Sequence, residues 1–267
     1  MERYAAVKER MIQQSDVAIT GVDDQMTWDI GDCRMMDTQG QEDRICIPVS
    51  GSRALAQGIF ACDSQIISTM AGGEPRVICD LAGVSSLRGT HNAQNAAAAA
   101  ACIDLWQFDE EAVAQAFRSF PGLPHRLEEV GRAGSVVFIN DSKATNADAA
   151  ARALQSFDVI YWIAGGRAKE GGVAGLRPLM NRVRKSFLIG EAAEKFSAVL
   201  AGYTDNRVCA TLQRAVEEAY REARQDTAEE VAVLLSPACA SYDQFTNYEA
   251  RGDMFRSLVR TLPGVDA

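Results

Sequence analysis

Residues 135–157 read SVVFINDSKATNADAAARALQSF, an apolar run that ends in polar residues and leads into an alanine-rich stretch. The run predicts a buried strand, and residues 145–157 predict a helix that packs against it. Asn140, Asp141, Ser142 and Lys143 stand between them. Polar groups at the end of a buried strand need polar partners. This strand, turn and helix are typical of α/β proteins.

The same pattern recurs through the second half of the chain. Four further apolar segments, each followed by a helical pattern, cover residues 158–166, 185–190, 207–212 and 230–238. Five strands that alternate with helices predict a parallel, doubly wound sheet. The carboxyl ends of such strands lie at one edge of the sheet, where ligands bind.

The first part of the chain has a different texture. Residues 1–14 predict a helix, and residues 17–24 predict a buried strand that runs into a polar turn. Residues 29–88 predict short antiparallel strands or a sheet edge, because Gly, Asp and Pro interrupt short apolar stretches. Two further helices are predicted over residues 91–106 and 110–120.

A domain boundary is predicted at FPGLPHR, residues 120–126. This segment holds two prolines and a glycine, which the interiors of helices and strands do not readily accommodate. We therefore expect one domain over residues 1–121 and a second over residues 122–267.

Composition excludes several classes of protein. The chain is 47% apolar and 24% charged, as globular proteins are, and has no apolar run of about 18 residues that could span a membrane. A net charge of −9 repels nucleic acid. Seven cysteines without a C-x-x-C pair, and an N-terminus without a secretory signal, predict a cytoplasmic protein. With two histidines, a zinc site of His and Cys is not expected.

Polar side chains gather in the turns that follow the predicted strands. The first turn carries Asp141 and Lys143, the second carries Lys169 between glycine pairs, and the last carries Ser241. Lysines near hydroxyls and helix N-termini suit an anion, either carboxylate or phosphate. Asp141 or Thr145 alone is more often a helix cap than a functional residue. The pattern by itself predicts an anion-binding α/β domain.

Several segments resemble the Mur ligase family of ATP-dependent ligases. They are FINDSKATN, IAGGRAKEGG, LIGEAAEKF and, most distinctively, LLSPACASYDQFTNYEARGDMFRSLV, with GTHNAQNAAAAAA and MERYAAVKERM upstream. The resemblance runs along the whole chain and is weakest between residues 25 and 75. It implies a partial central ATPase-type domain with a mixed sheet in residues 1–121. A complete Rossmann-like, D-glutamate-binding domain would follow in residues 122–267.

The resemblance also implies a reaction. The family forms an amide from a carboxylate and an amine through an acyl phosphate, with ATP and Mg²⁺. The long C-terminal motif points to the addition of D-glutamate to UDP-N-acetylmuramoyl-L-alanine in peptidoglycan synthesis. Cationic groups are needed because negative charge accumulates on the transferring phosphoryl oxygens. The implied protein is a cytoplasmic monomer.

The resemblance assigns a nucleotide site. Asn92 and Asn95, three residues apart and so on one helix face, would read an adenine edge. An asparagine pair at a helix start is otherwise more often a cap. Arg126 would contact the phosphates, although an arginine after a linker is most often a solvated charge. Asp141 would hold the ribose or the hinge, and Lys143 would neutralise phosphate charge.

The resemblance likewise assigns a site for D-glutamate. Thr145 and Lys169 would bind one carboxylate, while Ser241 and the backbone near Tyr248 would bind the other. Two carboxylates need two separate sets of donors, and these turns supply them. Tyr242 would form a wall of the pocket, and a packed aromatic residue is an equally good interpretation of it.

Lys8 has the spacing of a metal-site residue. Tyr4 to Lys8 fits a Tyr-x-x-x-Lys segment in which the family carries a carbamylated lysine beside Mg²⁺. Carbamylation would turn the ammonium into an anionic oxygen donor, which a hard cation accepts. On spacing alone, an ordinary lysine on a helix surface is the better interpretation.

One motif of the family does not occur. The 267 residues contain no G-x-x-x-x-G-K-[ST]. The resemblance is therefore to the C-terminal portion of a ligase, without the N-terminal domain and the P-loop. We expect this chain to be inactive alone, with an unpaired sheet edge in residues 1–121. The alternatives are a non-catalytic D-glutamate- or nucleotide-binding module, a subunit of a split ligase, or a related ligase such as folylpolyglutamate synthase.

Overall fold

The computed structural model describes residues 2–37, 45–70, 74–105 and 108–266. The chain divides into two compact units, Met1–Phe120 (unit 1) and Pro121–Ala267 (unit 2). Among the described residues, none of the helices has both the length and the apolar character that crossing a membrane requires.

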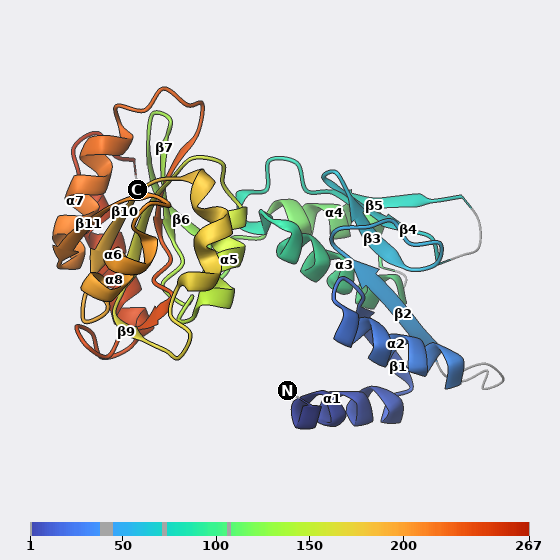
Figure 1. Cartoon of the computed structure of the whole chain (residues 1–267). Helices are drawn as coiled ribbons and strands as arrows, with labels where there is room; N and C mark the ends of the chain where they lie inside the picture. Colours follow the sequence, from blue (N-terminus) through green and yellow to red (C-terminus); the bar gives the residue numbers. More distant parts are fainter. Residues whose placement is uncertain (1, 38–44, 71–73, 106–107, 267) are drawn as a thin grey trace. The chain divides into compact units, whose positions relative to one another are not determined.

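Unit 1 is built on a five-stranded mixed sheet in the order β1-β2-β3-β4-β5 (Figure 1). The first three strands are parallel, and β4 and β5 add in antiparallel fashion. The mixed sheet predicted for the first domain is therefore confirmed. The strands are β1 Val17–Gly21, β2 Ile45–Ser50, β3 Ile59–Cys62, β4 Gln65–Ser68 and β5 Arg76–Asp80.

Alanines let helix α3, Thr90–Leu105, pack closely on this sheet. Ala96, Ala97, Ala100 and Ala101 are buried in the unit 1 core together with apolar residues of β2, β3, β4 and β5. The other helices of unit 1 are α1 Glu2–Gln14, α2 Gln25–Asp37, the short η1 Ser85–Leu87 and α4 Glu110–Arg118.

Helix α2 was not predicted. Residues from 29 onward were expected to be strands, which is wrong for residues 29–37. The stretch contains Gly31, which disfavours a helix, but a Cβ there would lie 2.8 Å from Thr20 Oγ1 on β1. The glycine is thus required by packing. Residues 38–44 and 71–73 of the predicted strand region, and residue 106 of a predicted helix, lie outside the described residues.

Unit 2 contains a six-stranded sheet in the order β11-β10-β8-β12-β7-β6. The five predicted strands are present and all run parallel. The sixth, the edge strand β6, was not predicted and pairs antiparallel with β7. The strands are β6 Glu128–Ala133, β7 Val136–Asn140, β8 Ile160–Gly165, β10 Val183–Ile189, β11 Asp205–Ala210 and β12 Val231–Leu235.

Helices cover both faces of the sheet, which confirms the doubly wound fold. One buried cluster contains residues of α5, η2 and α6, and the other contains residues of α7 and α8. The predicted helix over 173–181 is instead a 3₁₀ helix, and it contains Pro178, which is unfavourable inside an α-helix. These elements are α5 Ala147–Gln155, η2 Ala174–Arg182, α6 Ala193–Leu200, α7 Leu212–Ala223 and α8 Tyr248–Arg260.

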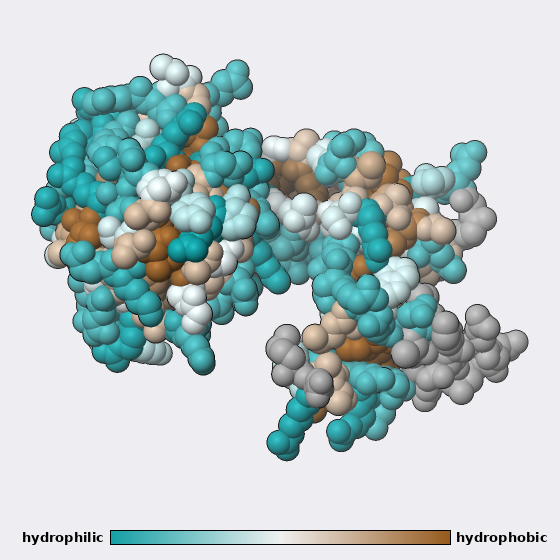
Figure 2. Space-filling model, viewed as in Figure 1, coloured by the Kyte–Doolittle hydropathy of each residue, from teal (hydrophilic) through white to brown (hydrophobic). Residues whose placement is uncertain are grey.

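The parallel strands place their carboxyl ends, and the turns that follow, at one edge of the sheet. Two of these turns pair with each other through the short antiparallel strands β9 Arg167–Ala168 and β13 Cys239–Ala240. The visible surface of unit 2 is mostly hydrophilic, with small separated apolar areas (Figure 2).

Candidate functional site

Three loops at the carboxyl edge of the unit 2 sheet are joined by backbone hydrogen bonds. The Asp141 amide, after β7, donates to Leu235 O at the end of β12, at 2.8 Å. The Gly165 amide, at the end of β8, donates to Pro237 O after β12, at 2.9 Å. Pairing of β9 with β13 extends this connection. The structure thus brings together the loops that carry Asp141, Lys169 and Ser241.

Asp141 is a buried carboxylate at the start of the first loop. Its Oδ2 accepts a hydrogen bond from Ser236 Oγ at 2.8 Å, and Oδ1 accepts one from the Leu127 amide at 3.4 Å. Burial raises the pKa of the Asp141 carboxyl from its ordinary 3.8 to about 7, and the two hydrogen bonds and the charge of Arg126 oppose this rise. Asp141 therefore joins three segments, and its carboxyl keeps its proton up to a higher pH than that of a solvent-exposed aspartate.

This raised pKa predicts how stability depends on pH. An acid with a higher pKa in the folded state stabilises the fold below its unfolded pKa and loses that contribution as pH rises through its folded pKa. From about pH 4 to 7, the free energy of unfolding of unit 2 should fall by roughly 1 kcal/mol per pH unit because of Asp141. Urea unfolding followed through the NMR signals of β12 measures this, and Asp141→Asn should remove the contribution. Parallel pH profiles for the two proteins would contradict it.

Arg251 connects the loop after β7 with the loop after β12. It is 1% exposed, and its Nη2 donates to Ser142 O at 2.8 Å and to Cys239 O at 3.1 Å. Its Nε donates to Ser142 Oγ at 3.0 Å, and that hydroxyl donates to Tyr248 O at 2.8 Å. Nη1 has no hydrogen-bond partner among the described residues. Burial lowers the pKa of Arg251 to about 10.

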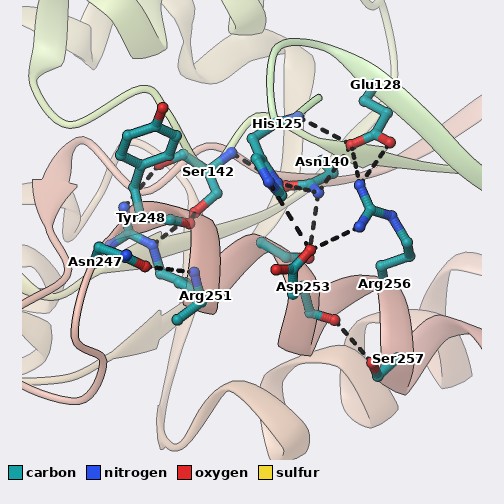
Figure 3. Close-up of polar contacts among 12 residues, drawn as sticks. His125, Glu128, Asn140, Ser142, Asn247, Tyr248, Arg251, Asp253, Arg256 and Ser257 are labelled. Atoms are coloured by element: carbon teal, nitrogen blue, oxygen red, sulfur yellow. Dashed lines mark hydrogen bonds and ion pairs between the residues drawn. The ribbon is translucent and has the colours of Figure 1, made fainter. Parts of the chain in front are cut away.

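A second buried contact joins β7 to α8 through His125 (Figure 3). Asn140 Oδ1 accepts from the Ser142 amide, which orients the side chain, and Asn140 Nδ2 lies 3.1 Å from His125 Nδ1. An amide nitrogen only donates, so Nδ1 is the acceptor and the ring proton lies on Nε2. Asn140 Nδ2 also donates to Gly252 O at 3.2 Å.

An ion-pair cluster lies beside this contact. Arg256 Nη2 donates to both carboxylate oxygens of Glu128, at 2.8 and 3.0 Å, and Arg256 Nη1 donates to Asp253 at 2.7 Å (Figure 3). Glu128 also accepts from the His125 amide at 2.9 Å. The cluster fixes the turn that precedes Arg126.

Cationic groups surround the first loop. Lys143 is exposed, its amide donates to His125 O at 3.1 Å, and its Nζ lies 5.5 Å from the centroid of the Tyr248 ring. Arg126 is exposed and lowers the pKa of Asp141 through its charge. The structure therefore brings Arg126, Asp141, Lys143 and Tyr248 together.

The other predicted substrate residues stand on the paired loops. Lys169 directly follows β9 and is exposed, whereas Ser241 directly follows β13 and is buried. The pairing of β9 with β13 holds the two loops side by side. Tyr242 is 66% exposed, so it is not a packed core aromatic.

Neither Asp141 nor Thr145 caps helix α5. The N-cap is Asn146, whose Oδ1 accepts from the Ala149 amide at 2.8 Å. The Asp141 carboxylate points instead to Ser236 and Leu127. Capping is thus excluded as the role of Asp141 and Thr145. Thr145 is half-buried at the end of the first loop.

In unit 1, Asn92 and Asn95 lie together in the first two turns of α3. Asn95 Nδ2 donates to Asn92 Oδ1 at 3.3 Å, and Asn92 Nδ2 donates to Arg88 O at 3.0 Å. Neither bond is an N-cap, in which the side chain accepts from a backbone amide. Gln94, on a different face of the helix, donates from Nε2 to Asp23 Oδ2 at 2.9 Å and so ties α3 to the loop after β1.

Lys8 lies on the exposed surface of α1. Its Nζ stands 5.5 Å from the centroid of the Tyr4 ring, one turn earlier. The described part of the chain holds no group of three or more His, Cys, Asp or Glu side chains arranged to bind a metal ion. A single lysine does not make a magnesium site, so the described residues do not by themselves fit Mg²⁺.

The sequence marks Asn140 as a polar strand end that needs a partner, but it assigns no role to His125 or Arg251. His125, Asn140 and Arg251 are buried and polar, but their partners lie up to 112 positions away in sequence. Two features of the sequence could have pointed to these residues. Arg251 and Gly252 are adjacent within a long motif, and Asn140 is a polar residue at the end of an apolar strand.

Comparisons with known sequences extend over both units. Residues 125–239 match the family described as "Mur ligase, glutamate ligase domain". The chain is 49% identical over 268 residues to a UDP-N-acetylmuramoylalanine–D-glutamate ligase of Chelativorans sp. (strain BNC1), covering 100% of this chain and 56% of that relative. A ligase of the same name from Nitrobacter hamburgensis is also 49% identical, over 99% of this chain. The chain thus spans about 56% of the length of these relatives.

Solved structures share the fold at low sequence identity. A pseudomurein peptide ligase type C from Methanothermus fervidus superposes with a TM-score of 0.62 at 12% identity, over 97% of this chain and 59% of its own. The bifunctional folylpolyglutamate synthase/dihydrofolate synthase from Yersinia pestis, complexed with AMPPNP and Mn ion, gives 0.60 at 16% identity, over 96% and 56%.

Proposed function

The chain belongs to the Mur ligase family, and we propose that it is the C-terminal portion of an ATP-dependent ligase that adds D-glutamate to UDP-N-acetylmuramoyl-L-alanine. One structural observation carries the proposal. The loops after β7, β8 and β12 are joined at one edge of the unit 2 sheet. We place the enzyme in the cytoplasm, as a monomer, in peptidoglycan synthesis.

D-glutamate would bind at this joined edge. Thr145 and Lys169 receive one carboxylate, and Ser241 with the backbone near Tyr248 receives the other. The four positions come from three loops that Arg251 and the β9–β13 pairing hold together, which favours a rigid pocket over a flexible one. A charge-assisted hydrogen bond from Lys169 would supply most of the affinity for its carboxylate.

We propose residues for nucleotide binding in each unit, taken separately. In unit 1, Asn92 and Asn95 present paired amides to an adenine edge. In unit 2, Asp141 holds the ribose or the hinge, and Arg126 and Lys143 supply positive charge toward the phosphates. A solved relative by fold was determined with AMPPNP and Mn ion, which supports this class of ligand. When bound, ATP would supply the phosphoryl group that activates the carboxylate as an acyl phosphate.

This chain's own contribution to amide formation would be positioning. By fixing both carboxylates of D-glutamate, the three loops leave its amine free to attack the acyl carbon, and such alignment lowers the barrier. Lys143 and Arg126 would neutralise charge on the departing phosphate. Lys8, if carbamylated, would contribute to the metal only together with ligands that the described residues lack.

Binding of D-glutamate tests the proposal directly. Calorimetry on this chain should detect D-glutamate, and Lys169→Ala should weaken its binding at least about tenfold, because one charge-assisted hydrogen bond is lost. Lys195→Ala, which removes another exposed lysine from unit 2, should bind as the wild type does. L-glutamate serves as the ligand control. Equal binding by the Lys169 and Lys195 variants would contradict the assignment.

An assay of product formation distinguishes a ligase portion that is inactive alone from a chain that is an active enzyme by itself. We expect negligible ATP- and D-glutamate-dependent product from this 267-residue chain alone, because it contains no G-x-x-x-x-G-K-[ST] sequence. Clear turnover would contradict this part of the proposal. The two relatives at 49% identity reported above both carry the D-glutamate ligase name, which favours this amino acid over that of a folate-type ligase.

A further inference from the structure

The segment between β13 and α8 reaches across two neighbouring loops at the carboxyl edge. Asp243 Oδ2 accepts from the Glu191 amide, in the loop after β10, at 3.0 Å. Gln244 Nε2 donates to Ala210 O, at the end of β11, at 2.7 Å. Immediately upstream, Ser241 O accepts from the amides of Gln244 and Phe245, which closes a turn. The turn that contains Ser241 is therefore tied to the ends of both β10 and β11.

Two glycines make room for this connection. A Cβ on Gly190 would lie 2.1 Å from Asp243 Oδ2, so a side chain there would expel the carboxylate. A Cβ on Gly166 would lie 2.4 Å from Ala240 O, the residue before Ser241. Both glycines have positive φ, +69° and +125°, which side chains rarely adopt. The loops after β8 and β10 are thus shaped to receive the loop after β12.

The charges around Asp243 suit a fixed carboxylate. Glu191, which pairs with Arg167 at 3.0 Å, is the main cause of the raised pKa of Arg167, and the charge of Asp243 adds to it. The charge of Asp243 also opposes the lowering of the Arg251 pKa by burial. The hydrogen bonds that Arg251 donates go to two carbonyls and a hydroxyl. Asp243 therefore supplies negative charge near the buried Arg251, while its Oδ2 accepts a hydrogen bond from the Glu191 amide.

We propose that Asp243 is a positioning residue, which fastens the Ser241–Tyr242 loop to the loop after β10 across the side-chain-free positions Gly166 and Gly190. It would not contact the ligand. It would set the distance between Ser241 and the Lys169 loop, and so the spacing of the two carboxylate-binding sets. This inference rests on the proposed D-glutamate site.

Paired variants test this fastening through ligand affinity. Asp243→Ala and Gly190→Ala should each weaken D-glutamate binding about tenfold, and the double variant should be no weaker, because both changes break the same contact. Asp243→Asn keeps an oxygen acceptor and should retain most of the affinity. Equal binding by wild type and Asp243→Ala would overturn the proposal, as would additive losses in the double variant.

Matched controls separate this contact from general effects. Asp205→Ala removes an exposed carboxylate at the start of β11, on the opposite edge of the sheet. Gly202→Ala imposes the same left-handed strain, at φ +81°, with nothing within 4 Å of the new Cβ. Both controls should bind D-glutamate as the wild type does. If Asp205→Ala lost as much affinity as Asp243→Ala, or Gly202→Ala as much as Gly190→Ala, the result would count against the proposal.

Hydrogen exchange of the Glu191 amide decides the contact independently of any ligand. It should be faster in Asp243→Ala than in wild type or Asp205→Ala, and unchanged exchange would overturn the fastening. Failure of wild type to bind D-glutamate while the Glu191 amide behaves as expected would count against the proposed function and leave the fastening supported.

Discussion

Gly252→Ala should lower the free energy of unfolding of unit 2 by about 3 kcal/mol, at the upper end of overpacking costs. The added Cβ would lie 2.2 Å from His125 Nδ1 and 3.0 Å from Asn140 Oδ1. At a helix position with open space around it, Gly→Ala would raise the free energy of unfolding by up to about 1 kcal/mol. The clash with His125 is therefore what makes this substitution destabilising. Urea unfolding followed through the NMR signals of β12 measures the change.

His125 cannot move aside to accommodate the methyl group. Its amide donates to Glu128 and its carbonyl accepts from Lys143, while its φ of +63° already holds the turn in an unusual conformation. The new methyl group would therefore break the contact between His125 and Asn140 or displace α8. Gly175→Ala, in a 3₁₀ helix with nothing within 4 Å of the new Cβ, is the control and should be close to neutral. If Gly252→Ala were as stable as Gly175→Ala, the turn that contains His125 would have moved to accommodate the methyl group, and the prediction would be wrong.

The alternating pattern of unit 2 was predictable because its central strands β7, β8 and β12 are buried on both faces. Residues 136–139 and 231–235 are continuous apolar runs, and such runs followed by amphipathic helices leave few alternatives. Strand β6, Glu128–Ala133, has no such run, since it lies at an edge and carries three charged residues and a glycine. Its position depends on pairing with β7 and on the bond between Arg132 and Asp266, which are tertiary contacts.

The same limit applies to the candidate site. Polar residues at strand ends predict where a ligand would bind, because the parallel topology itself places those ends together. What holds the loops in register could not be predicted from local pattern. Arg251, for example, stands in the first turn of a helix whose sequence gives no sign of its contacts.

A pair of aspartates in unit 1 shows the same limit. Asp23 and Asp24 are adjacent in the sequence, but Asp24 accepts a hydrogen bond from the Thr27 amide, whereas Asp23 accepts hydrogen bonds from the Gly51 amide and the Gln94 side chain. Only contacts far apart in sequence distinguish the two.

Arg251→Met should cost about 4 kcal/mol of the unfolding free energy of unit 2. The variant keeps an apolar stem of similar length but removes the donors to Ser142 O, Ser142 Oγ and Cys239 O. Each hydrogen bond to a charged group is worth about 1.5–3 kcal/mol, and the acceptors left behind are buried. Against this loss, the variant no longer buries a guanidinium whose pKa falls to about 10 and whose Nη1 lacks a partner among the described residues.

The loss of three hydrogen bonds outweighs the gain from no longer burying a charged guanidinium, so the net effect of Arg251→Met is destabilising. Arg251→Lys keeps the charge but offers a single ammonium in place of a planar fork, and it cannot reach Ser142 and Cys239 at once in the same geometry. It should therefore lose most of the stability that Arg251→Met loses. Amide exchange at residues 142 and 239, measured beside urea unfolding, locates the damage at the joined loops. If Arg251→Met unfolded within about 1 kcal/mol of the wild type, the cost of desolvating the buried cation would offset its three hydrogen bonds. Arg251 would then hold the loops in register without stabilising the fold.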